Sequence, residues 1–299
     1  MTVAAGRPSA TVVIPTYNAA DTLARALASV EDAGTATEIL VVDDGSADRD
    51  RLRALVAADP RAALIEKPAR GNAAQSRAIG LARAAGDIVL FLDADDRFRP
   101  GHVARRIALH AEGDAGLILG RFRLADDSGE RDGPMAAYPG GDVAAYIFCG
   151  GGDARSSTLS VRRDRLHGVT WDAALRKHQD WGFAIAVQRA GATIGFDPVA
   201  GVVIDIAGGG RMSGRSDVAA SLAFMDGHLA DPAIRRRFLI GRIRTSIRIG
   251  DLRAARQFRA TLCKTRPSAK ERALSAAMIA AARLGVAQAA WRLLASAKR

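Results

Sequence analysis

Three polar clusters in the first hundred residues combine residue types that bind metal ions and phosphorylated ligands. Each cluster follows a short apolar run. In chain order they are Thr16-Tyr17-Asn18, Asp43-Asp44-Gly45-Ser46 and Asp93-Ala94-Asp95-Asp96. Carboxylates that are brought together repel one another unless a cation lies between them. Carboxylate oxygens suit Mg²⁺ or Mn²⁺, so Asp93 and Asp95 are the predicted metal ligands.

Each cluster also has an ordinary structural explanation when it is taken alone. An Asp-Gly-Ser sequence after a strand, as at 44–46, is typical of a turn or a helix N-cap. An Asp-x-Asp pair occurs by chance in many chains. Three such clusters at the ends of successive strands are much harder to obtain by chance, and their order favours a functional site.

The elements that must position these clusters are predicted from hydrophobic periodicity. Apolar runs without polar alternation predict buried strands at 11–14, 39–42, 63–65 and 88–92, and helical spacing predicts helices between them. This alternation indicates an α/β fold with a parallel sheet that is covered on both faces. Ligands of such sheets bind outside the carboxyl ends of the strands, where the three clusters are expected to converge. No Gly-x-Gly-x-x-Gly follows the first strand and no Gly-x-x-x-x-Gly-Lys-Ser/Thr is present, which disfavours dinucleotide and P-loop sites.

Together the motifs resemble those of family 2 glycosyltransferases of the GT-A fold. The residues that carry the resemblance are VIPTYN at 13–18, ILVVDDGS at 39–46, Ser76-Arg77 with Gly80, and FLDADD at 91–96. The resemblance covers residues 9–205. It implies a GT-A domain over 1–228, with a nucleotide-sugar half at 1–112 and an acceptor half at 113–228. A basic helical extension is expected at 229–299, with four helices from residue 234 onward that are broken at Gly250-Asp251, at 266–268 and at Gly285.

The resemblance also implies roles for individual residues that bind the donor. Thr16, Tyr17, Asp43 and Asp44 would hold the nucleotide base and ribose, and Arg77 would approach the diphosphate. Asp93 matches an aspartate on the ribose side. Asp95 matches the metal-binding aspartate, whose ion bridges the diphosphate of a nucleotide sugar. Many members carry a histidine after the catalytic aspartate, but this chain has Gly208-Gly209-Gly210-Arg211 there, and Arg211 is expected to close on the diphosphate instead.

A further carboxylate, Asp180, matches the catalytic general base of the family. Gln179-Asp180-Trp181 opens a predicted helix, where an acidic residue is also favoured by the helix dipole alone. The expected activity is a metal-dependent, inverting glycosyl transfer from a nucleotide-diphosphate sugar to an acceptor hydroxyl. A UDP-sugar is the favoured donor and a saccharide or lipid-linked molecule the acceptor, in polysaccharide or glycolipid assembly. Two alternatives stay open: a nucleotidyltransferase, and a non-catalytic nucleotide-sugar-binding module that acts through its basic tail.

The charge of the 299-residue chain is concentrated in that tail. Residues 229–299 hold 17 Lys and Arg against three acidic residues, which gives +14, whereas the rest of the chain carries −3. An anionic membrane surface is therefore a candidate partner of the tail, and no nucleic acid is expected because no recognised binding motif accompanies the arginines. The two cysteines and the lack of a signal-peptide pattern favour a cytoplasmic protein, with a peripheral position at the inner membrane face as an option.

Overall fold

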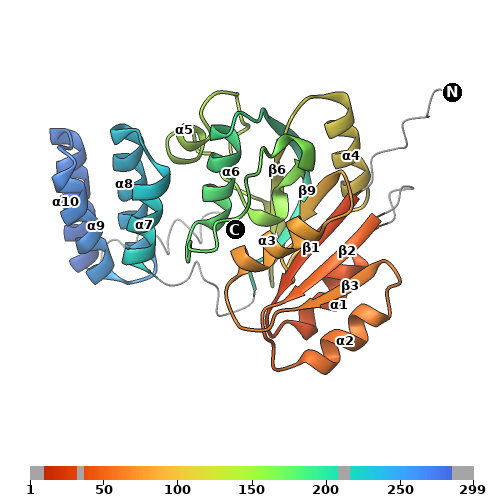
Figure 1. The fold of residues 1–299 in the computed structure, drawn as a ribbon. Helices are drawn as coiled ribbons and strands as arrows, with labels where there is room; N and C mark the ends of the chain where they lie inside the picture. The colour runs from red at the N-terminus through yellow and green to blue at the C-terminus, as the bar shows by residue number, and fades with distance from the viewer. Residues whose placement is uncertain (1–9, 32–36, 208–215, 285–299) are drawn as a thin grey trace. The chain divides into compact units, whose positions relative to one another are not determined.

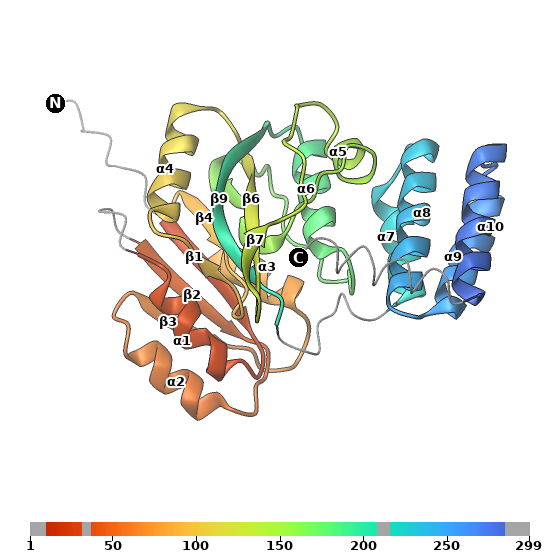
Figure 2. The same cartoon turned by 180° about the vertical axis from the view of Figure 1, so that it is seen from behind.

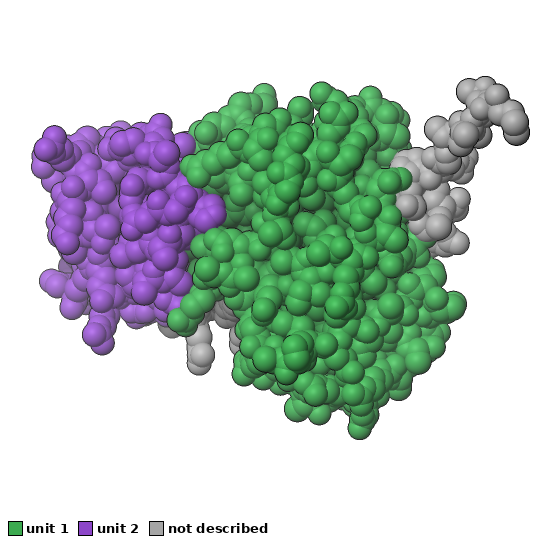
Figure 3. Space-filling model, viewed as in Figure 1, with its two compact units in different colours: residues 1–147, 151–208 green, residues 148–150, 209–299 purple. Residues whose placement is uncertain are grey.

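The computed structural model describes residues 10–31, 37–207 and 216–284. The chain divides into two compact units, coloured separately in Figure 3. Unit 1 comprises Met1–Ile147 and Gly151–Gly208, and unit 2 comprises Phe148–Gly150 and Gly209–Arg299. This division places helix α7 (Val218–His228) in unit 2. The boundary predicted from the sequence lies after this helix, between residues 228 and 229, and it stays a prediction.

Unit 1 is built on a mixed sheet, whose strands in the described residues run in the order β3-β2-β1-β4-β8-β6-β9-β5, with β7 added to β6. The strands are β1 (Ala10–Thr16), β2 (Thr37–Asp43), β3 (Ala62–Glu66), β4 (Ile88–Phe91), β5 (Arg97–Phe98), β6 (Leu117–Asp126), β7 (Gly129–Asp132), β8 (Ser160–Arg162) and β9 (Ile194–Asp205). Strands β1 to β4 pair in parallel, as the apolar runs predict. Strand β8 is antiparallel to both of its neighbours, β4 and β6.

The order of the parallel strands reverses between β1 and β4, which makes a topological switch point there. The helices of unit 1 are α1 (Ala20–Ala28), α2 (Arg49–Ala57), α3 (Ala73–Arg83), α4 (His102–Glu112), α5 (Val143–Phe148) and α6 (Gln179–Arg189). The chain steps from β1 to β2 to β3 in one direction and then returns to add β4 on the other side of β1. Because such crossovers are right-handed, α3 covers the face opposite to α1 and α2, as Figures 1 and 2 show from the two sides. Ligands bind at this kind of switch point.

Helix α3 lies close to β1 because a glycine stands at their contact. A Cβ atom on Gly80 would lie 2.3 Å from Cγ1 of Val13. Real Cβ atoms do not approach carbon this closely, so any larger residue would push α3 away from the sheet. The same helix carries Arg77, whose position therefore depends on this close packing.

An aromatic cluster fixes the start of α6 to the end of β4. The rings of Phe91 and Trp171 meet edge to face at 4.9 Å, and Trp171 stacks on Phe183 at 4.4 Å between ring centroids. Phe91 ends β4 and Phe183 lies in the first half of α6. All three side chains are buried, so apolar burial holds the N-terminus of α6 next to the loop that follows β4.

Unit 2 is helical and is stabilised by capped helices around an aromatic core. Its helices are α7, α8 (Pro232–Arg248), α9 (Leu252–Lys264) and α10 (Ala269–Arg283). The breaks predicted at Gly250-Asp251 and at 266–268 are observed, with Asp251 and Ser268 as N-caps. The fourth helix predicted within 234–299 lies outside the described residues. The rings of Phe148, Phe224 and Phe238 contact one another at centroid distances from 5.4 to 6.2 Å.

Among residues 10–31, 37–207 and 216–284, no helix is both long enough and apolar enough to cross a bilayer.

Candidate functional site

The loops that follow β1, β2 and β3 are tied together by backbone hydrogen bonds at one edge of the sheet. The amide of Asp44 donates to the carbonyl of Thr16 at 2.9 Å, and the amide of Lys67 donates to the carbonyl of Asp43 at 3.1 Å. Thr16 is buried, and its Oγ1 has no hydrogen-bond partner among the described residues. A buried hydroxyl without a partner is costly, so Thr16 is suited to bind a ligand at this edge.

Asp43 anchors a turn that connects the first two polar loops. Its buried carboxylate accepts hydrogen bonds from the amide of Ser46 at 3.0 Å and from the Ser46 hydroxyl at 2.5 Å. The Ser46 hydroxyl in turn accepts from the amide of Asn18 at 2.8 Å, and Asn18 Oδ1 accepts from the amide of Ala47 at 2.8 Å. The turn that the sequence predicts therefore exists, and it holds the first two polar loops against each other.

Asp44 forms a buried ion pair with Lys67, which the sequence pattern did not predict. Its Oδ1 accepts from Lys67 Nζ at 2.5 Å and from the amide of Gly71 at 2.7 Å, and both charged side chains are buried. The guanidinium of Arg70 lies 4.1 Å above the ring of Tyr17, which is 40% exposed. An exposed aromatic ring next to a cation offers a surface on which a nucleotide base can stack.

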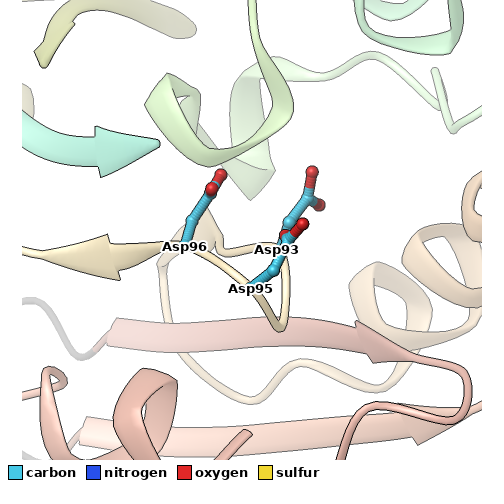
Figure 4. A group of neighbouring side chains, drawn as sticks. All are labelled: Asp93, Asp95 and Asp96. Atoms are coloured by element: carbon cyan, nitrogen blue, oxygen red, sulfur yellow. The ribbon is translucent and has the colours of Figure 1, made fainter. Parts of the chain in front are cut away.

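The carboxyl groups of Asp93, Asp95 and Asp96 converge, with one oxygen of each within 4.8 Å of the others. Figure 4 shows all three extending to the same side of the loop after β4. Asp96 is buried, and its oxygens accept from the Ser157 hydroxyl at 2.6 Å and from the amide of Asp205 at 3.2 Å. Burial, followed by the charges of Asp93 and Asp95, raises the pKa of Asp96 well above its usual value.

Asp93 and Asp95 are the members of this cluster that fit a metal ion best. Asp96 anchors the loop from within the protein, whereas Asp93 is half-buried and Asp95 is exposed. Three carboxyl groups this close destabilise one another unless protons or a cation balance them. The donor set contains only oxygen, which matches Mg²⁺ or Mn²⁺ rather than a thiolate-seeking metal.

Arg77 joins this acidic cluster to the start of α6. Its side chain is buried, Nη2 donates to Oδ1 of Asp93, and Nη1 donates to Oε1 of Gln179 at 3.2 Å. The guanidinium also lies 4.9 Å above the ring of Trp171. Its Nε has no hydrogen-bond partner among the described residues, so Arg77 retains an N–H group that can donate a hydrogen bond to a phosphate oxygen.

Asp180 is the second residue of α6, adjacent to Gln179. Burial raises the pKa of Asp180 to about 7, and the nearby carboxylate of Asp153 adds to the shift. The amide of Trp181 donates to Asp180 at 2.9 Å, and the charges of Arg77 and Arg155 oppose the rise. A carboxyl group with this pKa can accept a proton near neutral pH.

The structure brings most of the predicted site residues to one edge of unit 1. Thr16, Asp43 and Asp93 stand at the ends of β1, β2 and β4, and Arg77 bridges from Asp93 to the residue before Asp180. The roles implied for these residues stay predictions. Arg211 lies outside the described residues.

Four residues at this site were not predicted from the sequence. Lys67 and Arg70 follow β3, so they stand at the same edge as the three predicted clusters, and the end of the third strand was the signal that could have found them. Ser157 follows a Gly-rich segment and gave no periodic signal. Asp153 is 28 residues from its partner Trp181, a separation that leaves no local pattern.

Comparison with known proteins identifies the family. Residues 11–166 match the family described as "Glycosyl transferase family 2". The chain is 28% identical over 196 residues to the amylovoran biosynthesis glycosyltransferase AmsB of Erwinia amylovora, covering 61% of this chain and 65% of AmsB, just under two thirds of its length. It is 26% identical over 296 residues to the succinoglycan biosynthesis protein ExoO of Rhizobium meliloti, covering 91% of this chain and 80% of ExoO.

A solved structure supports the same fold. The crystal structure of S. aureus TarS 1-349 in complex with UDP-GlcNAc is 15% identical, with a TM-score of 0.64 over 96% of this chain and 92% of that one. At this identity the likeness concerns the fold, and it confirms the predicted GT-A architecture with C-terminal helices. With its motifs, its fold and the match over residues 11–166, the chain belongs to glycosyl transferase family 2 and is a glycosyltransferase.

Proposed function

We propose that the protein transfers a sugar, with inversion, from a nucleoside-diphosphate sugar to the hydroxyl of an acceptor, in a metal-dependent reaction. The observation that carries the proposal is the bridge made by Arg77 between Asp93 and Gln179. It joins the carboxylates suited to a metal–diphosphate group to the helix that begins with Asp180. Donor-binding and proton-accepting groups therefore belong to one connected site.

The donor is assigned to the carboxyl ends of β1 and β4, at the switch point of the sheet. Thr16, Tyr17, Asp43 and Asp44 surround the place of the base and ribose, and Arg77 would contact the diphosphate; Arg211 is a further candidate for that contact. Asp93 and Asp95 would hold Mn²⁺ or Mg²⁺, which supplies stabilisation of the negative charge that develops on the departing diphosphate. The TarS complex with UDP-GlcNAc supports a UDP-sugar as donor.

Asp180 would act as the general base. It takes the proton of the acceptor hydroxyl while the oxygen forms a bond to the anomeric carbon and the nucleoside diphosphate leaves with the bonding electron pair. A positioned base of this kind contributes about 10²–10⁴-fold to the rate. A pKa of about 7 leaves a substantial fraction of Asp180 ionised at neutral pH.

A saccharide or lipid-linked acceptor in polysaccharide assembly is supported by the names of several relatives. AmsB is an amylovoran biosynthesis enzyme, and a further relative from Escherichia coli, 28% identical over 118 residues, is named as a glucosyltransferase that acts on a diphosphoundecaprenol-linked sugar. An enzyme with such an acceptor works at a membrane surface.

Unit 2 offers a charged surface for membrane association. Arg237, Arg244 and Arg248 are exposed on α8, and their spacing of seven and four residues places them along one face of the helix. We name these three residues the α8 basic stripe. Basic residues near an anionic bilayer contribute about 1 kcal/mol each to binding. Association of unit 2 with anionic lipid is therefore part of the proposal.

The replacement Asp95→Asn tests the metal and donor site. We expect it to reduce the affinity for UDP in the presence of Mn²⁺ by at least tenfold, because one anionic ligand of the ion is lost. Isothermal titration calorimetry with UDP, with and without Mn²⁺, measures this. Asp132→Asn is the matched control, because Asp132 lies on β7 with its side chain 81% exposed. Unchanged Mn²⁺-dependent binding of UDP by Asp95→Asn would contradict the proposal.

A further inference from the structure

Asp153 is a carboxylate that the proposed reaction does not use, although it lies beside the proposed base. Its Oδ1 accepts a hydrogen bond from the indole Nε1 of Trp181 at 2.9 Å and another from the amide of Ala154 at 2.9 Å. Its Oδ2 accepts from Nε of Arg155 at 2.9 Å. Its side chain is only 19% exposed. A half-buried carboxylate with this many partners is held in a single orientation.

The indole contact connects Asp153 to the first turn of α6. Trp181 follows Asp180 directly, and its ring stacks on the ring of His178 at 4.7 Å with an angle of 2° between the planes. His178 caps the helix with φ of 61°, in the left-handed region that residues other than glycine rarely adopt. Fixing Trp181 therefore also fixes the turn that presents Asp180.

Charges of both signs surround Asp180. Asp153 and Arg155 come from the segment before the 3₁₀ turn at Ser156–Thr158, and Arg77 comes from α3. His178 lies on the chain just before the helix. The arginines favour the ionised form of Asp180, and Asp153 disfavours it. Arg155 is also ion-paired to Asp153, so it weakens the effect of that carboxylate.

We propose that Asp153 is a positioning residue for Asp180: it holds Trp181 through its indole hydrogen bond and places a second negative charge beside the base. This inference rests on the proposed function, because it gives Asp153 a purpose only if Asp180 accepts a proton. Burial and, after it, the charge of Asp153 keep the carboxyl group of Asp180 from ionising well below neutral pH, where an aspartate would be a weak base. Arg155 limits this effect.

Two replacements test the proposal by shifting the titration of Asp180 in opposite directions. Asp153→Asn keeps an oxygen acceptor for the Trp181 indole and removes the charge, so Asp180 should ionise about one pH unit lower. Arg155→Gln removes a nearby positive charge and the partner of Asp153, so Asp180 should ionise at higher pH. Asp132→Asn is the control: Asp132 is exposed on β7, and its replacement should leave the pH at which Asp180 ionises unchanged.

The measurement is ¹³C NMR titration of the aspartate carboxyl groups in metal-free protein, with the Asp180 signal assigned by its absence in Asp180→Asn. The acid limb of the pH profile of kcat/KM should shift in the same directions. A loss of structure would lower the activity of both variants, but it would not shift the ionisation of Asp180 to lower pH in one variant and to higher pH in the other. If Asp153→Asn does not fold, Trp181→Phe keeps a ring at this position and removes the same indole hydrogen bond; an unchanged pH profile of kcat/KM in that variant would overturn the positioning role.

The two proposals fail in different ways. Asp180 ionising at the same pH in wild type and in Asp153→Asn would overturn the role of Asp153. Shifts in the expected directions, together with full transferase activity of Asp180→Asn, would uphold the coupling of the charges but remove Asp180 as the base. These outcomes are independent because the NMR titration needs no substrate.

Discussion

Replacing Asp180 by asparagine should stabilise the protein at neutral and alkaline pH while it removes sugar transfer. In the folded protein, burial raises the pKa of Asp180 from 3.8 to about 7. In the unfolded chain the group ionises near its ordinary value. Between these two values the unfolded state loses a proton that the folded state retains, so ionisation of this group destabilises the fold as pH rises.

The size of the effect follows from the shift in pKa. About three pKa units at 1.36 kcal/mol each give roughly 4 kcal/mol as an upper limit. Asp180 is partly exposed, and solvent screening reduces this to about 2 kcal/mol at pH 8. Asparagine keeps an oxygen that can accept the amide hydrogen of Trp181, so the replacement removes the charge and little else. Below pH 4 wild type and variant should be equally stable.

Urea unfolding at pH 5 and pH 8, followed by tryptophan fluorescence, measures the effect. Two of the three tryptophans of the chain, Trp171 and Trp181, lie in unit 1, nine residues before Asp180 and directly after it, so their fluorescence reports on this unit. The gain in free energy of unfolding should grow by about 1–2 kcal/mol between the two pH values. In a separate assay the variant should still bind UDP with Mn²⁺ but transfer no sugar.

A particular result would refute this reasoning. If Asp180→Asn is less stable than wild type at pH 8, or differs from it by the same amount at both pH values, burial does not raise the pKa of Asp180. Near-normal turnover of the variant would show that another group accepts the proton. The exposed replacement Asp132→Asn should show neither change.

Gly80→Ala should destabilise the protein by about 1–3 kcal/mol in thermal or urea unfolding, because its Cβ would lie 2.3 Å from Val13 Cγ1. Gly227→Ala, a helical glycine with open space around it, should instead stabilise the protein by about 0.5–1 kcal/mol; equal effects of the two would contradict the packing argument. Changing the α8 basic stripe to glutamine should weaken binding to phosphatidylglycerol vesicles in sedimentation assays by roughly a hundredfold, at about 1 kcal/mol per arginine. Unchanged sedimentation, or equal sedimentation with phosphatidylcholine vesicles, would count against membrane association.

The first half of the fold could be predicted because three of its four strands, β1, β2 and β4, are buried on both faces. Such strands are continuous apolar runs, and every residue of β1 is buried. Strand β9 gave no such signal, because it contains Pro198 and a fully buried aspartate, Asp197. Asp197 is tolerated there because Arg105 and Arg106 of α4 form ion pairs with it. These partners are about 90 residues away in the chain, so the local sequence around Asp197 does not predict them.

At the site, too, the features that depend on neighbouring residues in the chain could be predicted, and the contacts between distant residues could not. Asp43, Asp93 and Asp95 could be predicted from strand ends, since parallel strands bring those ends together. The bridge from Arg77 to Gln179 spans 102 residues and depends on how α6 packs against β4, which the sequence does not express. The GT-A fold and the glycosyltransferase activity were predicted from the combination of motifs rather than from any one of them, and the family match and the structural comparison confirmed both.

Phe148 has a consequence for dissecting this protein into parts. It ends α5, a helix that otherwise belongs to unit 1, yet it contributes a ring to the aromatic core of unit 2. A fragment that starts at residue 209 would lack this ring, and a chain cut at residue 228 would leave Phe148 and Phe224 without Phe238. Neither unit is therefore an independent module that can be excised or exchanged by a single cut. Charge replacements on the surface of unit 2 are the better way to learn what it does.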